Sequence, residues 1–145
     1  MRLTTQTDYA LRMLMFLATR EGSQKIDDIA HVYGISKNHL MKVTQRLVGG
    51  GFVHSQRGRG GGLTLAHPPR EINVGAVVRV MEDTGQFVEC QMGSANNCII
   101  TPVCGLKHVL GDAVDAFLGH LDKFTLADIS RDQKGMANIF ESAAA

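Results

Sequence analysis

Apolar residues recur every three to four positions through the first part of the chain, which is the spacing of one face of an α-helix. The first such run predicts a helix that begins at Thr5 and ends before Gly22. Its predicted inward positions are Tyr9, Met13, Phe16 and Leu17. Thr5 followed three residues later by Asp8 resembles a capping box, so Asp8 is expected to cap the first turn.

Two shorter helical runs follow and are separated by a tight turn. Residues 26–33 have a helical apolar face and are followed by Gly34, a residue that often ends a helix. Ser36 is placed to cap the next helix, which the glycines at 49–51 end. Its predicted inward residues are Leu40, Val43 and Leu47. Two helices joined in this way predict a helix-turn-helix.

A β-hairpin is predicted directly after these helices. Residues 52–56 and 63–66 alternate between apolar and polar side chains, and they flank the glycine-rich stretch RGRGGG. The lysine and serine or threonine of a nucleotide-binding P-loop are absent, and a strand follows the glycines where a P-loop has a helix. The hairpin therefore predicts the wing of a winged helix-turn-helix.

The second half of the chain predicts two more helices on either side of a polar loop. Asn73 is placed to cap a short helix with Val74, Val77, Val78 and Met81 toward the core. From Leu106 to Leu121 the apolar surface is too broad for one thin layer of core. A helix of this kind commonly pairs with its copy, so a twofold homodimer is expected, and it would present two DNA-reading helices to paired half-sites.

The predicted fold is mainly α-helical with a small β-wing, a winged helix-turn-helix domain joined to a long dimerisation helix. The expected segments are a DNA-binding region at 1–67, a connecting helix at 68–89, a cysteine loop at 90–104, the dimerisation helix with a C-terminal segment at 105–130, and a flexible tail at 131–145.

Composition and charge narrow the class of protein. The 145 residues are 44% hydrophobic, enough for one ordinary core, and no apolar stretch approaches the roughly 20 residues of a membrane span, so we expect a cytoplasmic protein without a membrane partner. Residues 1–67 hold nine Lys or Arg against four Asp or Glu, a net charge of +5, whereas residues 68–145 hold six against ten, a net charge of −4. A basic first half suggests that a polyanion is its partner.

The second helix of the helix-turn-helix carries side chains suited to DNA. Its outward positions offer cations for phosphates and amides for base edges, without an intervening carboxylate. A solvated polar helix face is the plainer alternative, but two arginines on the following wing favour contact with double-stranded DNA. The predicted DNA-binding residues are Ser36, Lys37, Asn38, His39, Lys42, Gln45, Arg46, Arg57 and Arg59.

All three cysteines of the chain lie in one polar loop, at Cys90, Cys98 and Cys104, with gaps of seven and five residues. An odd number of cysteines in a cytoplasmic protein argues against a disulfide framework. An iron-sulfur cluster, a zinc ion that His108 would help to hold, and a reactive thiol all remain open. The wide spacing favours the cluster over zinc, and zinc over the thiol.

Four stretches together carry a family resemblance. In chain order they are LTTQTDYALR, IDDIAHVYGISKNHLMKVTQRLVGGGFVHSQRGRGGGLTLA, CIITPVCGLKHVL and FTLADIS. From Met1 to about Ser130 the chain resembles the winged-helix iron-sulfur regulators of the NsrR/IscR family. The first cysteine gap, seven residues here, differs from the five that are commoner in the family.

The resemblance is closest to the nitric-oxide-sensing repressors of that family. It implies a 4Fe-4S cluster held by Cys90, Cys98, Cys104 and Asp8 of the partner subunit. A 2Fe-2S cluster is disfavoured because Lys107 stands where those members have a histidine ligand, and His108 is one position away. The implied function is a dimeric repressor that releases DNA when nitric oxide nitrosylates the cluster.

Three other functions would explain part of the pattern. A regulator of iron or cluster status, with a 2Fe-2S cluster, would share every DNA-binding feature. An iron-sulfur electron carrier would have no use for a basic recognition helix and an arginine wing. An enzyme is not expected, because none of the six histidines forms a recognisable catalytic pattern with a cysteine.

Overall fold

The computed structural model describes residues 2–85, 88–91 and 96–145. Its α-helices are α1 (Thr5–Ala18), α2 (Ile26–Tyr33), α3 (Lys37–Gly49), α4 (Val74–Met81), α5 (Leu106–Leu121), α6 (Leu126–Ile129) and α7 (Gln133–Ala144). Strands β1 (Val53–Gln56) and β2 (Gly62–Leu65) form the sheet, and two short 3-10 helices are η1 (Pro69–Glu71) and η2 (Glu89–Gln91). Among the described helices, none is both long enough and apolar enough to cross a membrane.

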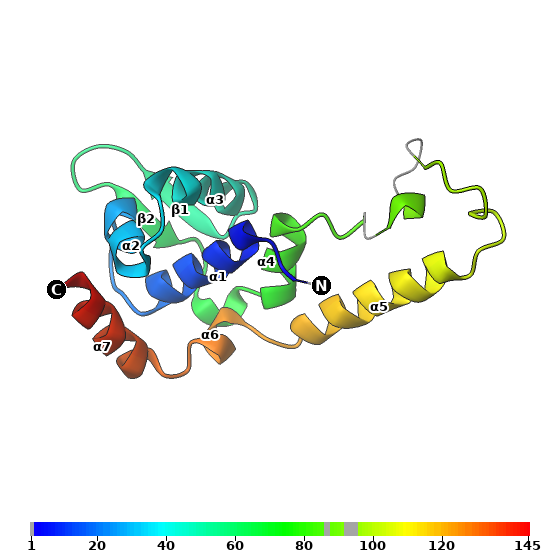
Figure 1. Cartoon of the computed structure of the whole chain (residues 1–145). Coiled ribbons are helices and arrows are strands. Elements are labelled where there is room, and N and C mark those ends of the chain that lie inside the picture. The colour runs from blue at the N-terminus through cyan, green and yellow to red at the C-terminus, as the bar shows by residue number, and fades with distance from the viewer. Residues whose placement is uncertain (1, 86–87, 92–95) are drawn as a thin grey trace.

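The main body contains every element except η2 and most of α5 (Figure 1). The apolar faces of α1, α2, α3 and α4 meet in one core, which is closed by residues from the sheet, η1's end, α6 and α7. Fully buried side chains at its centre include Met13, Leu14, Ile29, Leu40 and Leu47. The prediction of a mainly helical winged fold is confirmed.

The helix-turn-helix of α2 and α3 follows the local sequence signals closely. Gly34 ends α2 in the left-handed conformation, with φ of 62°, which glycine adopts without steric cost. The predicted inward residues of α3, Leu40, Val43 and Leu47, have no exposed surface. Because this apolar face is buried, the polar face of α3 is directed to solvent.

The wing is the predicted antiparallel hairpin. Val53 pairs with Leu65 at its base, and Gln56 pairs with Gly62 at its tip. Gly58 and Gly60 have positive φ, so the intervening turn depends on residues without a Cβ. Leu63 is buried in the core and also pairs with Gln24, which attaches the wing to the segment before α2.

The C-terminal segment differs from the flexible tail expected for residues 131–145, and that expectation is corrected. Residues 133–144 form α7, which packs against α1 and α2. Phe140 is buried, with its ring centroid 5.1 Å from that of Phe16 and 5.5 Å from that of Tyr33. This contact joins residues far apart in the chain, so the sequence of the tail alone could not predict it.

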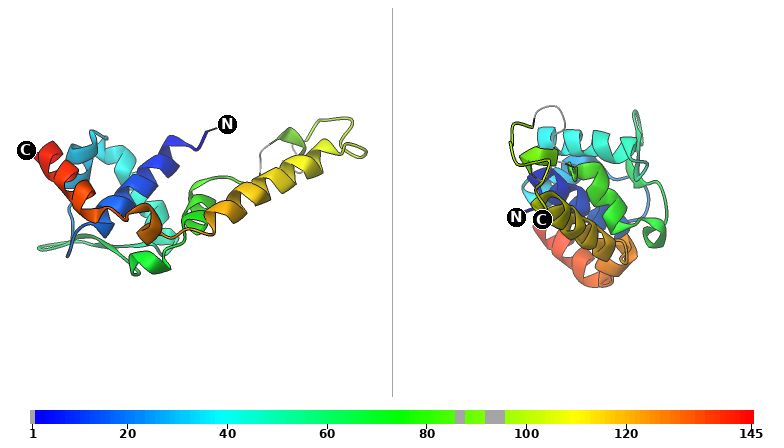
Figure 2. Two further views of the ribbon diagram at one scale, coloured as in Figure 1. Left: turned by 90° about the horizontal axis from the view of Figure 1, so that it is seen from below. Right: turned by 90° about the vertical axis from the view of Figure 1, so that its right-hand side faces the viewer.

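Helix α5 extends away from the body as an arm (Figures 1 and 2). Its base is attached by buried Leu118 and by Arg79 of α4, whose guanidinium donates to both carboxylate oxygens of Asp122 at 2.5 and 2.7 Å. These hydrogen bonds hold the pKa of Asp122 below its ordinary value. The far end of the arm joins the loop that carries the cysteines.

Candidate functional site

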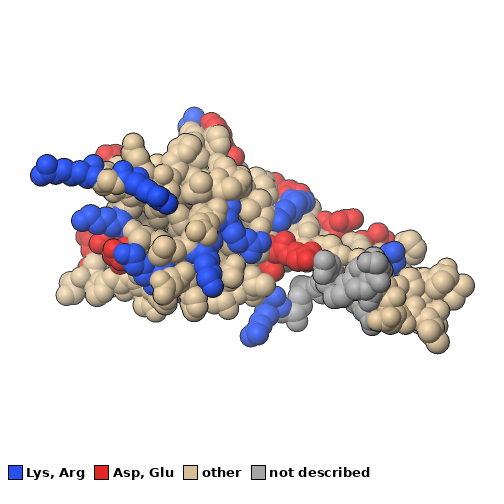
Figure 3. Space-filling model, turned by 90° about the horizontal axis from the view of Figure 1, so that it is seen from above, with Lys and Arg blue, Asp and Glu red and all other residues tan. Residues whose placement is uncertain are grey.

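The predicted DNA-binding side chains are all solvent-exposed in the structure. Most of them belong to α3, and Arg57 and Arg59 lie in the turn of the wing. Ser36 directly precedes α3 at its N-cap position, but its side chain makes no capping hydrogen bond, so the predicted side-chain cap is wrong. Figure 3 shows the Lys and Arg side chains gathered mainly over the winged-helix end of the molecule. The fold therefore places the basic half of the sequence on the surface, where it is accessible to a polyanion.

A hollow of about 590 Å³ lies between α3 and the wing. Three of the predicted residues, Lys37, Gln45 and Arg57, line it together, although Arg57 is 20 residues from Lys37 in sequence. Its lining also includes Lys25, Met41 and Gln56, which sequence analysis did not single out. Sequence analysis did not select Lys25 because it lies outside the predicted helices. It did not select Met41 because only the polar side chains of that helix were considered as DNA contacts.

Lys37 has an ion-pair partner in the free protein. Its Nζ lies 2.8 Å from both carboxylate oxygens of Asp27 in α2, and both side chains are more than half exposed. An exposed ion pair contributes about 1 kcal/mol or less, so a phosphate can compete with Asp27 for the ammonium group. Lys37 remains a candidate phosphate ligand.

Arg46 makes two hydrogen bonds within the chain, which sequence analysis did not foresee. It donates to the backbone carbonyl of Val80 in α4 at 2.7 Å and to Oε1 of Gln6 in α1 at 3.2 Å. Arg46 is exposed to solvent, but its guanidinium already donates to acceptors of the same chain. Arg46 thus joins α3 to two other helices, α1 and α4.

A second set of contacts completes this connection. Glu82, the residue that caps the end of α4, accepts from the backbone N–H of Thr4 at 2.6 Å and from the hydroxyl of Thr7 at 2.5 Å. We call Gln6, Arg46, Val80 and Glu82, with Thr4 and Thr7, the three-helix junction. It joins α3 and α4 to the first turn of α1, and the chain leaves Glu82 toward the first cysteine.

Asp8 lies in that first turn but is not the cap. Thr4 caps α1 through its hydroxyl oxygen, which accepts from the N–H of Thr7, so the capping box expected from Thr5 and Asp8 is wrong. Asp8 is half-buried, and its carboxylate accepts from Arg12 at 2.7 and 3.2 Å. Because about half of the side chain remains exposed, another partner can compete with Arg12 for the carboxylate.

Arg12 is itself positioned by α2. The hydroxyl of Tyr33 donates to the backbone carbonyl of Arg12 at 3.0 Å, and the Arg12 guanidinium lies 6.0 Å from the centre of the Tyr33 ring. Burial raises the pKa of Tyr33 to about 12, against the opposing effect of the nearby Arg12 charge. Tyr33 therefore remains a neutral donor at physiological pH.

The three cysteines are free thiols and each is partly buried. Cys98 is held in a polar turn, in which its N–H donates to Asn96 at 2.9 Å and its carbonyl accepts from the Thr101 hydroxyl at 2.8 Å. Residues 92–95 of the loop lie outside the described part. Within the described residues, no three His, Cys, Asp or Glu side chains of one chain are grouped closely enough to hold a metal ion.

The donor set of one chain consists of three thiols, which suit either an iron-sulfur cluster or a thiolate-bound metal ion. Three thiols without disulfide partners are the ligands that iron-sulfur clusters require. His108, the expected fourth ligand of a zinc site, is exposed on α5 and is not grouped with the thiols in the described residues. One chain thus offers three soft ligands.

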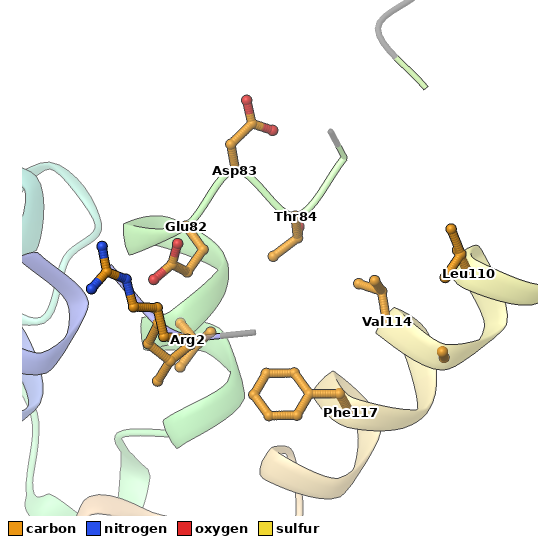
Figure 4. A pocket seen from close by; sticks show the side chains of 10 residues that line it. Arg2, Glu82, Asp83, Thr84, Leu110, Val114 and Phe117 are labelled. Carbon is orange, nitrogen blue, oxygen red and sulfur yellow. The ribbon is translucent and has the colours of Figure 1, made fainter. Parts of the chain in front are cut away.

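The arm exposes an unusual amount of apolar surface. Leu106 is 57% exposed and Val109 is 63% exposed, and in the loop Ile99 and Val103 are 93% and 88% exposed. On the side facing α4, a hollow of about 450 Å³ is lined by the arm residues Leu110, Val114 and Phe117 (Figure 4). Exposed apolar side chains gathered on one element are typical of sites of association.

The comparisons with known proteins agree on one family. The Rrf2 family, described as an iron-dependent transcriptional regulator, matches residues 3–132. The protein named HTH-type transcriptional regulator NsrR from Bacillus licheniformis is 51% identical over 135 residues, which cover 92% of this chain and 94% of that protein. The protein of the same name from Bacillus subtilis is 48% identical over 143 residues, covering 97% and 98%.

Solved structures support the same conclusion. The structure of T. potens IscR matches with a TM-score of 0.71 and 29% identity, covering 91% of this chain and 88% of that one. CymR, titled the global cysteine regulator of B. subtilis, matches with a TM-score of 0.69 and 25% identity, covering 90% and 97%. The relatives are named as transcriptional regulators, in agreement with the expectation that the chain is not an enzyme.

Proposed function

The chain belongs to the Rrf2 family of transcriptional regulators, and from this premise we propose that it is a dimeric repressor whose iron-sulfur cluster responds to nitric oxide. One observation carries the proposal. The thiol loop lies at the far end of the α5 arm from the body, yet the chain enters that loop from Glu82, which contacts the same helix, α1, as the recognition-helix residue Arg46. A change at the loop can therefore alter the DNA-binding surface.

The proposed ligands are Cys90, Cys98 and Cys104, together with Asp8 of the partner subunit. The free thiols support the first three. For the fourth, about half of the Asp8 side chain is exposed, and a partly exposed ion pair such as that with Arg12 is of modest strength. We propose a 4Fe-4S rather than a 2Fe-2S cluster, since Lys107 occupies the position of the histidine ligand in 2Fe-2S relatives. When bound, the cluster would supply iron that reacts with nitric oxide.

The dimer is proposed to form through the arm. Leu106, Val109, Ala113 and Phe117 follow one another at spacings of three and four, so they form a stripe along α5. All four are exposed in the single chain. Pairing this stripe with its copy would remove it from water and would set the distance between two recognition helices.

The junction then explains how ligation and DNA binding are linked. Ligation of the loop cysteines restrains the chain segment that follows Glu82, and ligation by Asp8 restrains the first turn of α1. Both restraints meet at the junction, where Glu82 holds Thr4 and Thr7, and Arg46 holds α3. Release of either restraint lets α1 and α4 shift against α3, so the two recognition helices lose their spacing on paired half-sites.

The proposal is tested by measuring DNA affinity during a nitric oxide titration. Protein purified without oxygen should contain about four irons and four sulfides per chain and bind a preferred DNA duplex, and nitric oxide should weaken that binding by about 5- to 150-fold, the range of common allosteric couplings. Fluorescence anisotropy of labelled DNA at a fixed salt concentration gives the affinity. About two irons per chain, with no response to nitric oxide, would favour a regulator of iron or cluster status instead.

Replacing Glu82 with alanine should weaken the coupling between the cysteine loop and the DNA-binding surface while sparing cluster binding. The variant removes two hydrogen bonds, those from the N–H of Thr4 and the hydroxyl of Thr7. The Thr7 hydroxyl can still donate to the Thr4 hydroxyl 3.0 Å away, so the net loss is about one hydrogen bond of coupling. The ratio of DNA affinities with and without nitric oxide should fall about 2- to 12-fold. Iron content and anisotropy are measured on the same preparation.

The matched control is Glu21→Ala, which removes an exposed carboxylate from the turn before α2. It should leave the ratio unchanged, whereas Glu82→Gln should restore part of it because the amide oxygen still accepts. An unchanged ratio in Glu82→Ala would show that the junction does not carry the coupling.

A further inference from the structure

Met41 is an apolar side chain on the solvent-facing surface of the recognition helix. It is 46% exposed, and it lines the hollow between α3 and the wing with Gln45 one turn further along. Lys37 lies one turn before it on the same side. Met41 lies beside the buried face of α3, which is formed by Leu40, Val43, Thr44 and Leu47, and it is not a member of the buried core.

The position of Met41 differs from that of the other exposed apolar residue of this helix. Val48 is 40% exposed but is not part of the lining of the hollow. Met41, in contrast, shares the lining of the hollow with side chains able to reach DNA, among them Lys37, Gln45 and Arg57. Any duplex that Lys37, Gln45 and Arg57 contact together would cover Met41 and remove it from water.

The major groove offers one apolar group that such a side chain can recognise. The 5-methyl group of thymine projects into the groove, while the other base edges present hydrogen-bond donors and acceptors. Methionine is unbranched and polarisable, so it adapts to a methyl group without a preformed pocket. The Gln45 amide, one turn away, is suited to paired hydrogen bonds with adenine.

We propose that Met41 is a specificity-determining residue that contacts the 5-methyl group of a thymine in each half-site. The inference rests on the proposed DNA binding and names what that surface reads. Lys37 and Arg57 contribute affinity for phosphates without regard to sequence, whereas Met41 and Gln45 select an A·T-containing step.

The test compares thymine with uracil, which lacks only the 5-methyl group. The cluster-loaded full chain is first used to select its preferred duplexes from random DNA, and each thymine of the selected site is then replaced by uracil in both half-sites. For the parent protein, one symmetric pair of replacements should weaken binding about 4-fold per half-site, the effect of one buried methyl group, and thus about 16-fold in total. Met41→Ala should bind thymine and uracil duplexes equally at that position.

Two further variants complete the test. Val48→Ala should keep the full response to uracil, and Met41→Leu should keep most of it. Thermal unfolding should be nearly unchanged in Met41→Ala, because the side chain lies outside the core. The alanine variant should also keep the salt dependence of the parent, since its phosphate contacts remain.

The outcomes separate this inference from the proposed function. Sequence-specific binding in which Met41→Ala responds to uracil as strongly as the parent would overturn the role of Met41 alone. A parent protein whose DNA affinity is unchanged by every thymine-to-uracil exchange would also overturn the role of Met41. Failure to select any DNA sequence would overturn the proposed function and this inference together.

Discussion

Cys104→Ser is expected to lose the iron-sulfur cluster and, with it, all response of DNA binding to nitric oxide. The chain has only three cysteines, so no spare thiol is available to replace one that is removed. A serine hydroxyl stays protonated near neutral pH and is a poor ligand for iron, whereas a thiolate is a strong one. Iron, sulfide and the visible absorption of the cluster should all fall to background after anaerobic purification.

The matched control is His108→Ala, four residues further along the chain. If a cluster is bound by the three cysteines, this variant should retain its full iron content, whereas a zinc site completed by His108 would be lost. Far-ultraviolet circular dichroism should match the parent in both variants, because Cys104 and His108 lie outside the core. Retention of iron and of the visible spectrum in Cys104→Ser would contradict the ligand assignment.

Asp8 is expected to behave differently from the cysteines. Asp8→Ala should keep a cluster on its three thiolates but alter its reaction with nitric oxide, since a carboxylate is a hard and weakly held ligand on iron. Identical spectra and identical nitrosylation in parent and variant would leave Asp8 with only its ion pair to Arg12.

Val109→Glu is expected to convert the dimer to a monomer and to weaken binding of a two-half-site duplex by about 100- to 10,000-fold, the loss that follows when two linked binding units act separately. Val109 is 63% exposed in the single chain, so a glutamate there is solvated in the monomer and the fold is retained. In the proposed dimer the same carboxylate would be buried in an apolar stripe, at a cost of several kcal/mol.

Sedimentation velocity gives the oligomeric state, and fluorescence anisotropy with full-site and half-site duplexes gives the affinity. The control is Asp115→Lys, a charge change on the exposed polar side of the same helix, which should leave the dimer intact. Half-site binding should be similar in the parent and in Val109→Glu. A variant that remains dimeric would show that the stripe on α5 is not the interface.

Local patterns in the sequence were enough to predict the DNA-binding half of the fold. Gly34 ends α2 with a positive φ as expected, Asn73 caps α4 by accepting from the N–H of Ala76, and the strands of the wing lie within one residue of their predicted bounds. These features depend on contacts within a few residues, such as caps, turns and the repeat of apolar positions. The same patterns also grouped the three cysteines in one loop, because that is a fact of sequence.

Local patterns failed where the partner of a side chain lies far along the chain. Residues 133–144 form a docked helix because Phe140 meets Phe16 and Tyr33, which are more than 100 residues away. Asp8 is not a cap because Thr4 accepts the hydrogen bond first, and Thr4 is in turn held by Glu82. Arg46 has the character of a DNA contact in sequence, and only folding supplies its acceptors at Gln6 and Val80.

The sequence by itself thus determined the elements, the basic surface and the set of thiols, since each follows from residue type and short-range spacing. Only the tertiary structure decided that Met41 shares a hollow with Arg57, and that Glu82 and Arg46 bring the start of the cysteine segment and the recognition helix onto one end of α1. The physical reason is that packing of the core determines which polar groups come within hydrogen-bonding distance. That choice depends on the whole set of buried side chains and not on any one segment.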